Sequence, residues 1–128
     1  MGHTATQHPL HSVTKPKQAR SEDTLRRILD AAEKLIEQRG HQDLSIAEVA
    51  RQAGSSIGGF YARFRSKDEL LRALEEHFFR QLTVLLDQLT APTAWSDSAP
   101  AEIVRGLLAV LIANHRRHRQ LIIAFIAR

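Results

Sequence analysis

Cysteine is absent from this chain of 128 residues, and aromatic side chains are few, with one tryptophan, one tyrosine and five phenylalanines. Without cysteine, neither a disulfide framework nor a thiolate metal site can form. The longest apolar run, Leu121 to Ala127, falls far short of the roughly 20 residues that a membrane-spanning helix needs. The first twenty residues also lack the apolar segment of a secretory signal. These absences predict a cytoplasmic protein that does not associate with membranes.

Signatures of catalysis are missing as well. The chain has no nucleophile elbow, no phosphate-binding loop and no spaced cluster of metal ligands, so we expect neither an enzyme nor a cofactor or metal. His115 and His118 stand three residues apart, which suits one face of a helix. No carboxylate is near them in sequence, so a solvated basic segment at a helix junction is favoured over a metal site.

Acidic residues are also absent from one internal segment. No carboxylate occurs between Glu48 and Asp68, although the chain contains 14 acidic residues. The cations of this segment are Arg51, Arg63, Arg65 and Lys67. The formal net charge is +4 and the sequence pI is about 10.1, which favours an anionic partner.

Periodic apolar residues predict that the chain is all-helical. Residues 1–20 show no periodicity and are expected to form a flexible basic arm. Ser21 is the predicted N-cap of a first helix, and Gly40 is its predicted stop. The apolar stripe of this helix consists of Leu25, Ile28, Leu29, Ala32, Leu35 and Ile36.

Two capping boxes open later helices. Ser45 with Glu48 begins a second helix that Gly54 ends, and Ser66 with Glu69 begins a long helix that runs to Leu89. Between them we expect a short helix over about residues 57–64. Its predicted core contacts are Ile57, Phe60, Tyr61 and Phe64.

The remainder predicts a fifth helix that begins with the apolar residues between Ile103 and Ile112, and a sixth helix that is cut short. A break from Thr90 to Pro100 precedes the fifth helix. Leu121 to Ala127 is expected to be exposed and prone to association. Helix core is the preferred role, over a ligand pocket, for four large side chains: Phe78, Phe79, Trp95 and Leu107.

The segment from Ser45 to Leu71 has the pattern of a DNA-binding helix-turn-helix. Ala50 is small enough for a close helix crossing, and Gly54 suits the turn. We predict that a recognition helix over about residues 56–63 enters the major groove of DNA. The residues expected to face the bases are Ser55, Ser56, Ile57, Gly58 and Gly59. The residues expected to contact phosphate or the minor groove are Ser45, Tyr61, Arg63, Lys67, Lys15, Lys17 and Arg20.

These motifs resemble the DNA-binding domain of the TetR (tetracycline repressor) family of bacterial transcriptional regulators. The resemblance covers about residues 21–90. Its most specific block comprises Phe60-Tyr61, Phe64 and Ser66-Lys67-Asp68-Glu69-Leu70-Leu71. The chain departs from the family pattern at Ser55, where an apolar residue is usual, and at Arg63, where histidine is common.

After the arm of residues 1–20, the resemblance implies a three-helix DNA-binding domain (21–66) and a connecting helix with part of a ligand-sensing domain (67–128). It also implies a homodimer on a palindromic operator, acting as a repressor that a small molecule releases. The family's dimer is built largely by its last two helices, and this chain ends before them. We therefore expect a fragment, a shortened product, or a different mode of dimerisation. An interaction module that forms mixed dimers with a full-length relative is the alternative function.

Overall fold

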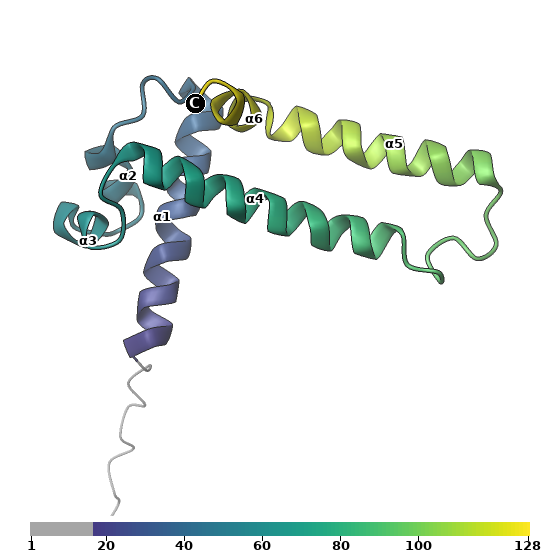
Figure 1. The fold of residues 1–128 in the computed structure, drawn as a ribbon, viewed down its shortest axis with the longest axis horizontal. Helices are drawn as coiled ribbons and strands as arrows, with labels where there is room; N and C mark the ends of the chain where they lie inside the picture. Colours follow the sequence, from purple (N-terminus) through teal and green to yellow (C-terminus); the bar gives the residue numbers. More distant parts are fainter. Residues whose placement is uncertain (1–16) are drawn as a thin grey trace, which may run out of the picture.

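A computed structural model describes residues 17–128, and these residues form helices without any strand. In chain order the helices are α1 (Lys17–Arg39), α2 (Ile46–Gln52), α3 (Ile57–Tyr61), α4 (Lys67–Leu89), α5 (Pro100–Arg117) and α6 (Arg119–Ile126). Helices α1 to α3 cluster around the start of α4 at one end of the molecule (Figure 1). From there α4 and α5 extend as a long antiparallel hairpin, and α6 returns to the C-terminal part of α1. The predicted all-α class is confirmed.

The core is centred on one face of α1. Ile28, Ala32 and Ile36 are fully buried and Leu35 is nearly so, at the three- and four-residue steps that place side chains on one face of a helix. Burying an aliphatic side chain of this size stabilises the fold by about 1.5–3 kcal/mol. Helices α2, α4 and α6 all pack against α1. The apolar stripe of α1 therefore joins α6, at the C-terminal end, to α2 and α4.

Helix α1 begins earlier than the sequence predicts. It starts at Lys17, so Ser21 lies inside the helix and its predicted role as N-cap is wrong. The Ser21 hydroxyl instead accepts a hydrogen bond from Arg63. Lys17 and Arg20, which were expected in a flexible arm, belong to the first turns of α1. Lys15 lies outside the described residues.

The two predicted glycine stops are confirmed. Gly40 follows α1 with a φ of 81°, and Gly54 follows α2 with a φ of 66°. This left-handed backbone region is costly for residues that carry a Cβ atom. Each glycine therefore lets the chain reverse directly after a helix, which sets the crossing of α1, α2 and α3.

Helix α6 docks on α1 through buried apolar side chains and one carboxylate. Leu121 and Ala124 are buried, so the predicted exposure of the 121–127 segment is wrong for its inner face, although Ile126 is 79% exposed. The Glu37 carboxylate accepts hydrogen bonds from the backbone amides of Gln120 (3.3 Å) and Leu121 (2.8 Å). A carboxylate at this place satisfies the first free amides of α6 and complements its helix dipole.

His118 forms the junction between α5 and α6, as the basic run predicted. Its side chain is only 12% exposed, however, and its Nε2 lies 3.1 Å from Oε1 of Glu33. The predicted solvated setting is therefore wrong for His118, because folding brings a distant carboxylate of α1 to the ring. Among residues 17–128 no group of three or more potential ligands could hold a metal ion. No helix in this range is long and apolar enough to cross a membrane.

The α4–α5 hairpin is closed by Trp95, which is half-buried in the connecting loop. Its indole Nε1 donates to the carbonyl of Leu89 at the end of α4, and its ring lies against Gly106 of α5. Elsewhere α5 is loosely held, because none of its residues is fully buried. The tryptophan therefore provides the packing that keeps the far end of the hairpin together.

Substituting Gly106→Ala tests this packing. A Cβ atom at Gly106 would collide with the Trp95 ring, so we expect a loss of about 1–3 kcal/mol in unfolding free energy. Trp95 is the single tryptophan of the chain, and its emission should shift to the red as the ring becomes hydrated. Ala109→Gly on the exposed side of α5 is the control, which should cost about 1 kcal/mol without changing the emission. A more stable Gly106→Ala protein with unchanged emission would contradict this account.

Candidate nucleic-acid interface

Serine caps open three successive helices at this end of the molecule. Ser45 Oγ accepts from the amide of Glu48 (3.4 Å), Ser56 Oγ from Gly59 (2.9 Å) and Ser66 Oγ from Glu69 (3.2 Å). Each serine has extended backbone angles, as an N-cap requires. A cap of this kind contributes about 1 kcal/mol. The caps set where α2, α3 and α4 begin, and so where their N-terminal amides point.

The reciprocal halves of the two predicted capping boxes differ from expectation. The Glu48 carboxylate does not reach back to the N-cap, because both of its oxygens accept from Arg39 of α1, at 2.8 and 2.9 Å. Glu69 accepts from the backbone amide of Arg65, one residue before the cap, at 2.8 Å. Glu69 thus holds the residue that precedes α4, and Glu48 connects α2 to α1.

The short helix α3 has one buried and one exposed side. Phe60 is fully buried and Phe64 is nearly so, and their rings lie 5.4 Å apart between centroids. Ile57 and Tyr61 are 52% and 50% exposed, so the prediction that they contact the core is wrong. The helix ends at Tyr61 rather than near residue 64. A helix of barely more than one turn therefore buries Phe60 and exposes Ile57, Gly58 and Tyr61 to solvent.

The residues predicted to face the bases lie together at the start of α3. Ser56, Ile57 and Gly58 are exposed, whereas Ser55 and Gly59 are half-buried. The Ser55 hydroxyl donates to the Ser56 carbonyl at 3.1 Å. A Cβ atom at Gly58 would meet no atom closer than 3.9 Å, whereas one at Gly59 would lie 2.7 Å from Ser55 Oγ. Gly58 is therefore open to an approaching partner, and Gly59 makes room for the serine pair.

The cations of the acid-free segment differ in their surroundings. Arg51 and Arg65 are exposed, and the Arg51 side chain is 78% accessible. Lys67 is half-buried, with Nζ 3.4 Å from the carbonyl of Gln42. Arg63 is half-buried and donates to protein oxygens on α1 and α3. The structure thus brings the predicted cations to one end of the molecule and engages Arg63 most fully.

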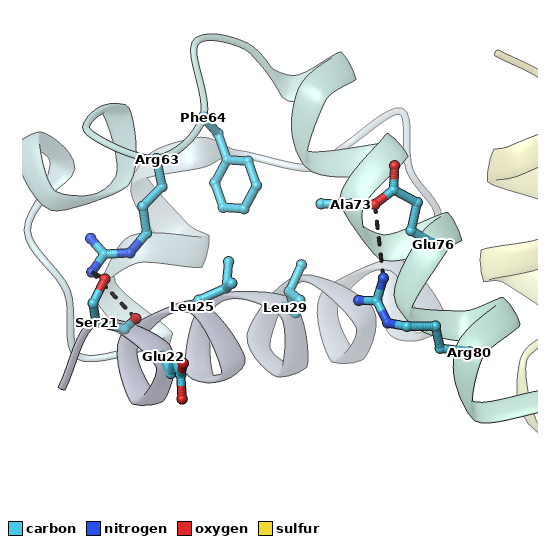
Figure 2. A pocket seen from close by; sticks show the side chains of 9 residues that line it. All are labelled: Ser21, Glu22, Leu25, Leu29, Arg63, Phe64, Ala73, Glu76 and Arg80. Atoms are coloured by element: carbon cyan, nitrogen blue, oxygen red, sulfur yellow. Dashed lines mark hydrogen bonds and ion pairs between the residues drawn. The ribbon is translucent and has the colours of Figure 1, made fainter. Parts of the chain in front are cut away.

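A hollow of about 370 Å³ separates α1 from the end of the α3 segment and the start of α4. Its floor is apolar, formed by Leu25, Leu29 and Phe64. Figure 2 shows Arg63 and Arg80 at opposite ends of this hollow, with Ser21 beside the Arg63 guanidinium. Sequence reasoning missed Ser21 as part of this region, because no local pattern connects it to Arg63.

Two short helices, α2 and α3, joined through the Gly54 turn and packed at the end of α1 and α4, form a helix-turn-helix whose second helix, α3, has an exposed side. Residues 28–74 match the model of the family described as bacterial regulatory proteins, tetR family. Residues 28–74 therefore form a DNA-binding domain of the TetR type.

Curated relatives agree with this assignment. The chain is 33% identical over 85 residues to the HTH-type transcriptional regulator BetI of Brucella anthropi, which covers 66% of the chain and 42% of that protein. It is 30% identical over 96 residues to the uncharacterized HTH-type transcriptional regulator YuxN of Bacillus subtilis, covering 74% of the chain and 31% of the relative. The matched region therefore spans less than half of the length of these relatives.

The two glycines of α3 should respond differently to alanine. Gly58→Ala should raise the unfolding free energy by about 0.5–1 kcal/mol, because alanine favours a helix and the site is open. At Gly59 the new methyl group would displace the Ser56 cap, and the loss of about 1 kcal/mol should cancel that gain. Urea denaturation of both variants measures the difference. A Gly59→Ala protein at least as stable as Gly58→Ala would show that the serines do not restrict this position.

Proposed function

We propose that this protein is a sequence-specific DNA-binding transcriptional regulator that acts as a ligand-responsive repressor. The observation that carries the proposal is the exposed face of Ser56, Ile57, Gly58 and Tyr61. It belongs to a segment that contains four cations and no carboxylate between Glu48 and Asp68. Such a face suits the edges of bases flanked by phosphates. Its shape, a short helix on a buried phenylalanine anchor, suits the major groove.

Small groups would read the bases in this proposal. Ile57 offers an apolar contact for a thymine methyl group, and Ser55 and Ser56 offer hydroxyls. Gly58 lets the backbone approach closely, because nothing projects from it. Gly59 has no Cβ atom and so leaves space for the side chains of Ser55 and Ser56.

Phosphate contacts would come from the ends of several elements. Tyr61 is half-exposed and carries a hydroxyl, and Ser45 is exposed at the start of α2. Lys67 lies in the first turn of α4, whose N-terminal amides also favour an anion. Lys17 and Arg20 at the start of α1, with Lys15 before them, would add charge against phosphate or the minor groove.

A cavity between α4, α5 and α6 supports the proposed ligand response. Its volume is about 370 Å³, and its walls are mostly apolar. Phe78 and Phe79 both line it, together with Phe125 from α6, whereas Trp95 and Leu107 do not. A volume of this order accepts a small organic molecule. Because α6 also docks on α1, an occupant would touch the helix that contacts the DNA-binding end.

The alternative, an interaction module that forms mixed dimers, is favoured by a different observation. Val104, Leu108 and Ile112 of α5 are each about half exposed, and α4 adds Val84. Apolar residues gathered on exposed helices are suited to contact another helical protein. Binding to DNA by the purified chain alone, without a relative, would decide against this alternative.

A double substitution, Tyr61→Ala with Lys67→Ala, tests the proposed phosphate contacts. Affinity for mixed-sequence duplex DNA should fall, and the slope of log K against log salt should decrease by about one unit for the lost lysine contact. Arg105→Ala, which removes an exposed cation of α5, is the control for a general loss of charge. Equal affinity in the double variant, or no salt dependence in the folded parent protein, would contradict the proposal.

Selection of bound duplexes from a random pool tests sequence specificity and dimerisation together. A palindrome whose half-sites are a helical turn or more apart is the expected result for a homodimer. A single half-site would indicate a monomer, and a pool without enrichment would rule out sequence-specific binding.

A further inference from the structure

Arg63 joins the recognition helix to α1 through three hydrogen bonds. Its Nη1 donates to the Gly59 carbonyl at 3.0 Å. Its Nη2 donates to the Ser21 hydroxyl at 3.2 Å and to the Ser21 carbonyl at 3.4 Å (Figure 2). One half-buried guanidinium thus connects two residues that are 38 positions apart in the chain and belong to different helices.

Helix α3 has little stability of its own. It contains five residues, and two of them are the glycines Gly58 and Gly59. Helices of this length are unstable in isolation, and each glycine costs about 1 kcal/mol relative to alanine within a helix. The helix therefore depends on contacts with its surroundings.

The guanidinium of Arg63 acts where α3 ends. The backbone amide of Arg63 donates to the Phe60 carbonyl at 2.9 Å, so the last turn is tightened. The side chain of the same residue donates to the preceding carbonyl, that of Gly59. A cation at the C-terminal carbonyls of a helix also complements the helix dipole. Arg63 therefore caps α3 from its C-terminal side, while Ser56 caps it from the N-terminal side.

The bonds to Ser21 restrict how α3 is oriented. Phe60 is the buried residue of α3. A single buried side chain fixes where a short helix lies but restricts its rotation less. A planar guanidinium holds its donors in a fixed fork, so bonds to both helices define a direction as well as a distance. Ile57 and Tyr61, on the exposed side, take their orientation from this attachment.

We propose that Arg63 is a positioning residue for DNA recognition, which holds α3 on α1 through Gly59 and Ser21, and that it is not the phosphate contact expected from its charge. The proposal rests on the DNA-binding function proposed above. Under this proposal the phosphate contacts come from Lys67, Lys17 and Arg20, whereas position 63 uses the fixed fork of an arginine side chain.

Charge-preserving substitution separates the two roles. Arg63→Lys keeps a cation but cannot bond to both helices as the guanidinium does. Its affinity for the duplex selected from the random pool should fall about tenfold, with the slope against salt and the affinity for a scrambled duplex unchanged. Arg65→Lys is the matched control, because Arg65 is exposed and its side chain should tolerate the exchange.

A double-mutant cycle tests whether Arg63 acts through Ser21. Ser21→Ala removes the hydroxyl and leaves the carbonyl, so its effect should be smaller, about two- to threefold. In the Arg63→Lys background Ser21→Ala should cause no further loss, because the two changes remove the same connection. Fully additive losses would contradict the proposal.

Other results would overturn it directly. If Arg63→Lys binds the selected duplex as the parent does, while Arg63→Ala lowers the salt slope by about one unit, Arg63 is a phosphate contact. If the parent protein binds no DNA, the proposed function fails. The structural role of Arg63 can then still be tested without DNA, by amide exchange.

Amide exchange in residues 57–61 should be several-fold faster in Arg63→Lys than in Arg65→Lys. Equal rates would show that Arg63 does not hold α3.

Discussion

The buried stripe of α1 is the constraint on which the rest of the structure depends. Ile28, Ala32 and Ile36 exclude solvent completely, and α2, α4 and α6 each pack against this helix. Helix α3 lacks such a stripe and is held through Phe60 and the side chain of Arg63. A protein of this size has little core to spare, so loss of one large side chain from α1, at about 2–5 kcal/mol, would loosen the DNA-binding end and the α4–α6 end together.

Local signals predicted most of the helices. The serine caps at Ser45 and Ser66 and the glycine stops at Gly40 and Gly54 act within three or four residues of themselves, so the sequence contains all the information they need. The apolar stripe of α1 is long enough to show its period. For the same reason the sequence could indicate a helix-turn-helix and the segment in which its short second helix, α3, lies.

Contacts between distant residues account for the errors. Ser21 was expected to cap α1, but it lies inside the helix, and its hydroxyl accepts a hydrogen bond from Arg63, 42 positions away. The inner face of α6 was expected to be exposed because its partner, including Glu37 of α1, is more than eighty positions away. The exposed sides of Ile57 and Tyr61 were missed for another reason. A helix of five residues is too short for periodicity to separate a buried side from an exposed one.

Helix α1 also connects the two regions that the proposed function needs to couple. Near its start Ser21 is bonded to Arg63. Nearer its end Glu33 lies 3.1 Å from His118, and Glu37 accepts a hydrogen bond from the first turn of α6. These attachment points are 12 and 16 residues from Ser21, or about 18–24 Å along an unbroken helix. In the proposed ligand response, a tilt of α1 that follows a movement of α6 would also move Ser21, which is bonded to the Arg63 side chain that holds α3.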